Sequence, residues 1–125
     1  MTASVFWIPA LVTAVIIASL SHQPDLGLPE RLPDWLAHGV EYGFFTLTLI
    51  FAATNGFDVR RRTASRVAAA VAVASLYGIT DEWHQGFVGR DVSALDWVAD
   101  TAGAMMMAAV VLSVWRRMAG PQPPV

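Results

Sequence analysis

The chain has 125 residues, of which 55% are hydrophobic and 14% charged, with a formal net charge of -2. A soluble domain of this length typically carries about 25% charged residues, so the composition favours a membrane protein over a soluble helical bundle. The sequence has no basic surface interleaved with aromatic residues, which argues against binding to nucleic acid. Because the chain contains no cysteine, disulfides cannot stabilise it.

Four apolar segments follow one another along the chain, and each is close to the roughly 17–25 residues that a helix needs to span a bilayer. They predict an all-α membrane protein with four transmembrane helices, arranged as two helical hairpins in a single domain of residues 1–118. The expected helices cover about residues 4–20, 35–53, 67–85 and 94–116. Residues 119–125, rich in proline, are expected to form a disordered tail.

The first apolar segment has two interpretations, a cleaved signal peptide or a retained helix. Residues 1–4 contain no lysine or arginine, and Ala18-Ser19-Leu20 is a poor site for signal peptidase. A retained transmembrane helix is therefore the favoured interpretation.

Arginine predicts the orientation in the membrane, because short loops rich in positive charge remain in the cytoplasm. Arginines crowd the second connection and follow the last helix, at Arg60, Arg61, Arg62, Arg66, Arg116 and Arg117. In the other two connections Arg31 and Arg90 are balanced by acidic residues. Both termini are thus expected in the cytoplasm, with the connections 21–34 and 84–93 outside.

The chain also contains a repeat at an offset of 62 residues, in which six of the 16 residues from 22 to 37 recur. The matching pairs are His22-Gln23 with His84-Gln85, Gly27 with Gly89, Asp34-Trp35 with Asp96-Trp97, and Ala37 with Ala99. The repeated unit would be a helical hairpin, and two such hairpins would be related by a pseudo-two-fold axis along the membrane normal. Chance similarity is the alternative interpretation.

Ionisable residues gather at the outer ends of the predicted helices, whereas the inner halves carry no charge. His38, Glu41 and Tyr42 share one stripe of the second helix, at spacings of three and four residues. The outer ends of the third and fourth helices and their connection add Asp81, Glu82, His84, Gln85, Arg90, Asp96 and Asp100. Ionisable groups at membrane depth are costly and usually functional. The pattern predicts an outward-facing polar funnel lined by carboxylates.

The positions of glycine and tryptophan predict a close helix contact and the level of the membrane interface. Gly39-x-x-x-Gly43 matches the pattern that lets two helices pack closely. Tryptophans near the predicted helix ends indicate an interfacial belt, at Trp7, Trp35, Trp83, Trp97 and Trp115.

Together, these motifs resemble the VanZ-like family of small bacterial membrane proteins, over about residues 19–115. The most specific part is Asp81-Glu82-x-x-Gln85, followed by Gly89-Arg90, Asp96 and the small-residue helix through Gly103. The family's Asp-Lys-x-x-His element before a tyrosine reads here as Asp34-Trp35-Leu36-Ala37-His38 with Tyr42. Trp35 replaces the lysine, and Asp100 stands where many relatives have asparagine.

The resemblance implies a four-helix fold in the bacterial cytoplasmic membrane and a role in the cell envelope. The founding member is associated with low-level resistance to the lipoglycopeptide teicoplanin. We therefore expect the polar site to bind or shield an envelope lipid or another amphiphile. The partners expected are membrane lipids, a lipid-linked envelope intermediate or a lipoglycopeptide. The expected site includes Asp34 in addition to His38, Glu41, Tyr42, Asp81, Glu82, His84, Gln85, Arg90, Asp96 and Asp100.

Other functions are considered beside this one. A membrane-embedded hydrolase or transferase would use Asp81 or Glu82 as general base, His38 or His84 as acid, and Arg90 to hold an anionic head group. Proton-coupled transport is disfavoured by the uncharged inner halves of the helices. A purely structural role would have the carboxylates, Arg90 and Gln85 hold the hairpins together.

Metal binding is a further alternative for the same polar residues. Plausible ligands are His38, Glu41, Asp81, His84 and Asp96, but no spacing matches a specific metal motif. No metal or other cofactor is therefore assigned from the sequence.

Overall fold

The structure is a computed structural model that describes residues 3–23 and 33–119. This part of the chain contains four α-helices, two short 3-10 helices and no strand. The elements are η1 (Ala3–Trp7), α1 (Ile8–Ser21), α2 (Asp34–Ala53), η2 (Val59–Arg61), α3 (Ala64–Gln85) and α4 (Ala94–Met118). The predicted all-helical architecture is confirmed, and the expected boundaries agree to within a few residues. The predicted disordered tail lies, apart from residue 119, outside the described residues.

Side chains at the helix starts explain where the last two helices begin. The Thr63 hydroxyl accepts a hydrogen bond from the Arg66 backbone N–H at 3.4 Å, and Ser93 accepts one from the Asp96 N–H at 3.3 Å. These bonds satisfy N–H groups that have no partner within the helix. In α1, Pro9 occupies the first turn, where its missing N–H costs nothing.

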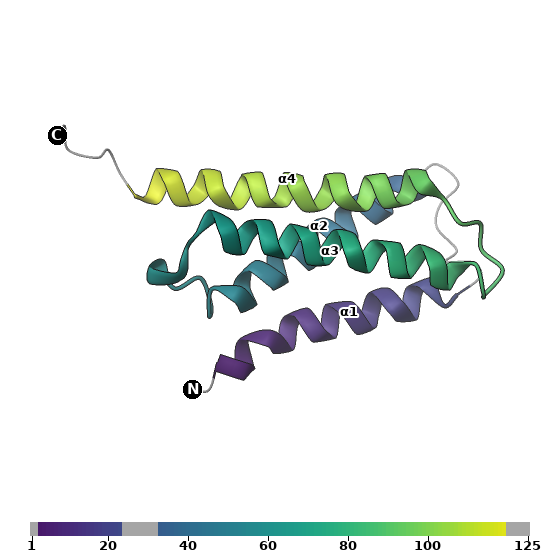
Figure 1. Ribbon diagram of the computed structural model, residues 1–125, viewed down its shortest axis with the longest axis horizontal. Coiled ribbons are helices and arrows are strands. Elements are labelled where there is room, and N and C mark those ends of the chain that lie inside the picture. The colour runs from purple at the N-terminus through teal and green to yellow at the C-terminus, as the bar shows by residue number, and fades with distance from the viewer. Residues whose placement is uncertain (1–2, 24–32, 120–125) are drawn as a thin grey trace.

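The four helices run in alternating directions, so that α1 and α3 point one way and α2 and α4 the other (Figure 1). The start of α1 and the end of α4 therefore lie at one end of the bundle, which we call the terminal end. The end of α1, the start of α2 and the connection between α3 and α4 lie at the opposite end, which we call the loop end. The predicted site residues are in the loop-end half of the bundle, because they lie late in α3, early in α2 and α4, or in the connection between α3 and α4.

The closest helix contact is the crossing of α2 and α4, where glycines face each other. A Cβ atom on Gly103 would overlap the backbone carbonyl of Gly39, and one on Gly43 would lie 3.3 Å from the Gly103 carbonyl oxygen. The absence of side chains at this point lets the two backbones touch. The close contact predicted for the Gly39 and Gly43 pattern is confirmed, and its partner is Gly103.

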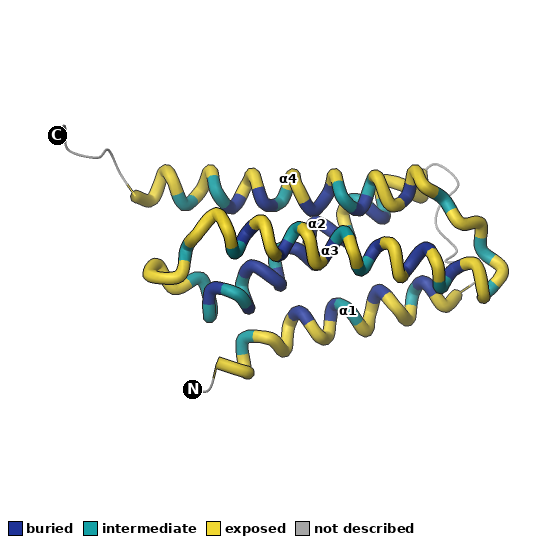
Figure 2. Tube along the Cα trace, in the orientation of Figure 1, coloured by how far each residue is buried: buried dark blue, intermediate teal, exposed yellow. Residues whose placement is uncertain are grey.

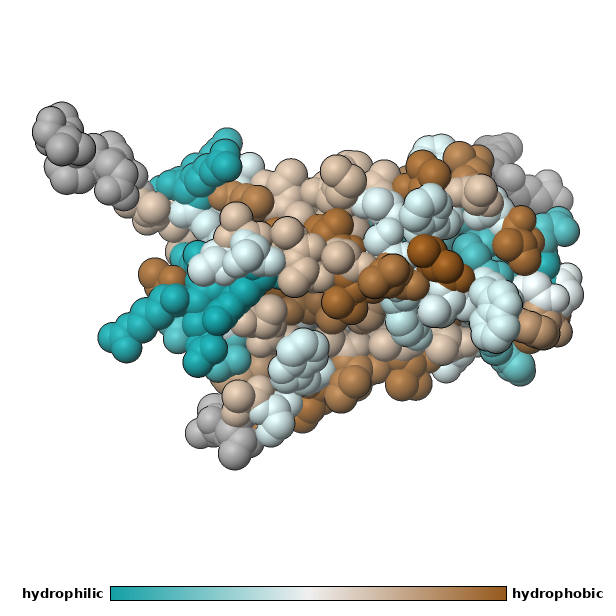
Figure 3. All heavy atoms as spheres, in the orientation of Figure 1, coloured by the Kyte–Doolittle hydropathy of each residue, from teal (hydrophilic) through white to brown (hydrophobic). Residues whose placement is uncertain are grey.

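The outer surface of the bundle is strongly apolar. On α1, buried residues recur every three or four positions and most of the other residues are exposed, as Figure 2 shows. Large apolar side chains that are at least half exposed include Leu11, Val15, Ile16, Phe44, Leu76 and Met106. On the face of the bundle drawn in Figure 3, hydrophilic residues gather toward the two ends and apolar residues lie between them. Such an extensive exposed apolar surface suits a lipid environment better than water.

Three helical stretches among the described residues are long and apolar enough to cross a membrane. They are Ala3–Ser21, Asp34–Ala53 and Ala94–Met118. The helix α3 is also long, at 22 residues, but it is rich in alanine and carries charged residues near both ends. The structure is thus compatible with a membrane protein, and it supports three of the four predicted spans.

Candidate functional site

The centre of the site is a contact between a histidine and an aspartate on different helices. His38, in the second turn of α2, places Nδ1 2.9 Å from Oδ1 of Asp100, in the second turn of α4. Both side chains are buried, with relative exposures of 5% for His38 and 0% for Asp100. The contact orients the imidazole ring and holds it between α2 and α4.

Glu82 approaches this pair from α3. Its exposure is 5%, and its Oε2 accepts a hydrogen bond from the Ser93 backbone N–H at 2.7 Å. One donor atom from each of His38, Glu82 and Asp100 lies within 4.8 Å of the other two. Three of the predicted site residues are therefore brought together from three helices.

Space for Asp100 depends on a glycine that no sequence motif marks. A Cβ on Gly78 of α3 would lie 2.8 Å from Asp100 Oδ2. Gly78 is one turn before Glu82, so the two residues share a stripe of α3. The Asp100 carboxylate consequently faces the same stripe of α3 that carries Glu82.

An apolar groove borders Glu82 at the loop end, between α3 and the start of α4. Its volume is about 580 Å³. The groove is lined by Ile79, Glu82, Trp83, Gly86, Phe87, Val92, Ser93, Ala94 and Trp97. Trp83 and Trp97, predicted as part of an interfacial belt, thus also form its walls. The volume is in the range of about 300–1,000 Å³ that is usual for small-molecule sites.

Asp81 faces a different part of the bundle from Glu82. Its Oδ2 accepts a hydrogen bond from Gln85 Nε2 at 3.3 Å, and both residues are buried. Asp81 and His84 line a smaller cavity of about 190 Å³ together with Ala18 of α1. The two adjacent acids, which the sequence pattern assigns to one funnel, therefore border two separate cavities.

His84 makes its closest polar contact with a residue outside the predicted site. Nε2 of His84 lies 3.2 Å from Nδ1 of His22, and the two rings are stacked with centroids 5.5 Å apart. The 62-residue repeat pairs these two histidines, and it is the one sequence signal that could add His22 to the site. The contact joins the ends of α1 and α3.

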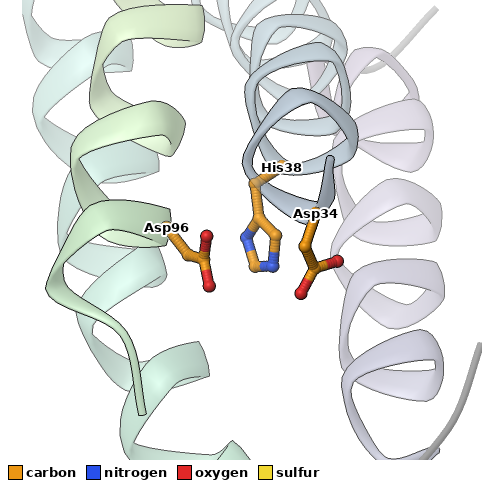
Figure 4. A group of neighbouring side chains, drawn as sticks. All are labelled: Asp34, His38 and Asp96. Carbon is orange, nitrogen blue, oxygen red and sulfur yellow. The ribbon is translucent and has the colours of Figure 1, made fainter. Parts of the chain in front are cut away.

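Arg90 pairs with Asp34 at the entrance to α2. Its guanidinium nitrogen lies 3.1 Å from Oδ2 of Asp34, whose side chain is 47% exposed. Asp34, His38 and Asp96 also offer three donor atoms within 4.8 Å of one another, and Figure 4 shows them converging from α2 and α4. Unlike Asp34, Asp96 is buried. Arg90 thus neutralises an acid at the rim of the cluster.

The remaining predicted residues lie deeper on α2. Tyr42 is fully buried, and its ring packs against Phe45 and Tyr77 with centroids 6.2 and 6.4 Å away. Glu41 is half-buried and interacts electrostatically with His38, Asp81 and Asp100. Glu41 is therefore within electrostatic reach of both Asp81 and Asp100.

This arrangement combines a buried set of acids and a histidine with an apolar groove that opens beside one of the acids. The carboxylates can accept hydrogen bonds or balance a positive charge, and the groove can hold an apolar chain. Within the described residues, two clusters of three residues could hold a metal ion, and both contain His38. Comparison of the chain with protein-family models, with curated proteins and with solved structures finds no match.

Proposed function

We propose that this protein is a VanZ-like integral membrane protein of the bacterial cell envelope that binds or shields an amphiphile at its loop end. The polar head of the amphiphile would lie against Glu82, and its apolar part would occupy the groove formed by α3 and α4. The observation that carries the proposal is the position of Glu82, a buried acid that also forms part of the wall of an otherwise apolar groove.

The chemistry of the groove indicates the kind of head group. Glu82 Oε2 is used by the Ser93 N–H, whereas Oε1 has no hydrogen-bond partner among the described residues. A free carboxylate oxygen favours an amine or another hydrogen-bond donor. Trp83, Phe87 and Trp97 offer ring surfaces to an acyl or prenyl chain. The ligand class is therefore an envelope lipid or amphiphile with a donor-rich head.

The proposed orientation places the loop end outside the cell. Arginines are concentrated at the terminal end, where Arg62 and Arg66 bond the backbone carbonyls of Phe57 and Ala53 at 3.2 and 3.3 Å. By the positive-inside rule, this end and both termini would lie in the cytoplasm. In this orientation α3 is a fourth membrane span, and the amphiphile would be bound from the outer leaflet.

We further propose that the two hairpins are copies related by a parallel pseudo-two-fold axis. His22 contacts His84, and His38 contacts Asp100, and both pairs are separated by 62 residues. In a two-fold arrangement, equivalent positions meet only near the axis. Two such self-pairs, one between α1 and α3 and one between α2 and α4, are what a real duplication would produce.

Mass spectrometry of lipids that co-purify with the protein tests the proposed function. The wild type, Glu82→Gln and Asp91→Asn would be purified from the same membranes in a mild detergent. Asp91 is an exposed acid in the connection between α3 and α4, and it does not line the groove. Its variant therefore removes one negative charge, as Glu82→Gln does, without changing the groove. We expect one enriched amphiphile with the wild type and Asp91→Asn, and its loss with Glu82→Gln. Identical lipid profiles for all three proteins would contradict the proposal.

A second candidate is an enzyme that hydrolyses or transfers part of the same amphiphile. The observation in its favour is that His38 is oriented by Asp100 at 2.9 Å and lies beside Glu82. A histidine held by a carboxylate is a common general acid or base. If the site is catalytic, Glu82→Gln should retain the bound amphiphile but stop its turnover. Loss of the amphiphile in this variant would instead favour binding or shielding.

A further inference from the structure

The buried cluster of His38, Glu82 and Asp100 contains two carboxylate oxygens whose hydrogen-bonding capacity is not used. In the part of the chain that the structure describes, Glu82 Oε1 and Asp100 Oδ2 have no hydrogen-bond partner. The other oxygen of each group is used, by the Ser93 N–H at 2.7 Å and by His38 at 2.9 Å. Buried polar atoms nearly always have partners, because an unpaired one loses its hydration without compensation.

Among the described residues, the positive charge near the cluster does not balance these acids. His38 can carry at most one positive charge, against two carboxylates in direct reach of it. Arg90, in the nearby connection, is paired with Asp34 at 3.1 Å. Taking a carboxylate out of water is expensive unless an opposite charge replaces the water. The cluster is therefore suited to a cation with more than one charge.

We propose that His38, Glu82 and Asp100 bind a divalent transition-metal ion of the Zn²⁺ type. Imidazole nitrogen favours such ions over Mg²⁺ and Ca²⁺, and carboxylates complete many zinc sites. Bonds of about 2.0–2.2 Å to a tetrahedral ion would place the donor atoms roughly 3.3 Å apart. Because the three donor atoms already lie within 4.8 Å of one another, side-chain rotations can close the site.

The cluster borders the apolar groove through Glu82. Of the three residues, Glu82 also lines the 580 Å³ groove, so an ion or a fourth ligand would approach the cluster from that side. Three protein ligands with an open fourth position are characteristic of reactive zinc sites rather than purely structural ones. The fourth position would face the groove.

The second cluster that could hold a metal consists of Asp34, His38 and Asp96. It is the weaker candidate, because Asp34 is exposed and a guanidinium already occupies it. A cation bound there would have to compete with Arg90. Since the two clusters share only His38, variants of the acids distinguish them.

Zinc titration of the metal-stripped, full-length protein in detergent tests the proposal. Isothermal calorimetry and elemental analysis after dialysis should give one Zn²⁺ per chain for the wild type and for Asp91→Asn. Glu82→Gln and Asp100→Asn should each weaken binding by at least about tenfold, because each removes a charged ligand. Asp34→Asn should bind as tightly as the wild type.

Thermal unfolding provides a second measurement that separates loss of the site from loss of the fold. Zn²⁺ should raise the unfolding temperature of the wild type and of Asp34→Asn, but not that of Glu82→Gln, which has nearly the same shape as the wild-type residue. Absence of stoichiometric zinc binding, or unchanged binding in Glu82→Gln and Asp100→Asn, would overturn the proposal. So would loss of binding in Asp34→Asn alone. Zinc binding and amphiphile retention are measured separately, so either can fail without the other.

Discussion

His38 Nδ1 lies 2.9 Å from Asp100 Oδ1, and this contact joins α2 to α4 inside the bundle. The two residues are 62 positions apart in the chain, as are His22 and His84, which are also in contact. One pair is buried and contains an acid, whereas the other is more exposed and consists of two imidazoles. The two contacts thus differ in kind, and the buried one lies at the centre of the candidate site.

His38→Ala should be among the most destabilising single changes at the loop end. It removes the partner of Asp100 Oδ1 and leaves a fully buried carboxylate without compensation, which typically costs about 3–5 kcal/mol. Asp100→Asn keeps an acceptor for the imidazole N–H, so it should cost less, about 1–2 kcal/mol. Unfolding in detergent measures both, with Asp91→Asn as the exposed control. A loss below about 1 kcal/mol for His38→Ala would show that this contact does not stabilise the fold.

Gly103→Ala should disrupt the crossing of α2 and α4, because its Cβ would overlap the Gly39 carbonyl. Overpacking of this kind costs about 1–3 kcal/mol or more, since neither backbone can move freely. Gly39→Ala is a matched control, because its Cβ would meet the Ala99 carbonyl oxygen at an ordinary 3.4 Å. We expect a clearly lower unfolding temperature for Gly103→Ala only. Equal decreases in the unfolding temperature for the two variants would contradict the prediction that a Cβ is excluded at Gly103 but tolerated at Gly39.

Arg90→Ala should have little effect on stability. Its partner Asp34 is half exposed, and exposed ion pairs contribute about 0–1 kcal/mol because water and salt screen them. The same unfolding assay at low and high salt checks this expectation. A loss comparable with that of His38→Ala would mean that Arg90 also compensates the buried acids.

Single cysteines can test the proposed orientation, because the natural chain has none. Arg60→Cys and Asp91→Cys both replace exposed residues, in the connections at the terminal end and at the loop end. A membrane-impermeant maleimide should label Asp91→Cys in intact cells, and Arg60→Cys only after lysis. Opposite sides for these two positions would establish that α3 crosses the membrane. Labelling of both in intact cells would contradict the four-span arrangement.

The amino-acid sequence alone is sufficient to predict the helices and the end of the bundle at which the polar residues gather. Long apolar runs bounded by proline, glycine and capping residues specify helices, and the alternation of four helices brings the polar ends of α2, α3 and α4 together. For this reason His38, Glu82 and Asp100 can be assigned to one site without knowledge of their contacts. The identities at an offset of 62 residues also pair His22 with His84, and these two residues are in contact.

The neighbour that each polar side chain faces depends on helix packing, which the sequence does not reveal. Adjacent residues on a helix point about 100° apart, but a sequence does not say which helix lies on which side. Asp81 therefore faces α1 and Gln85, whereas Glu82 faces α4 and His38. Gly78 and Gly103 acquire their roles in the same way, since each makes room for an atom of a distant segment. The predicted single funnel becomes two cavities because helix packing separates neighbouring acids.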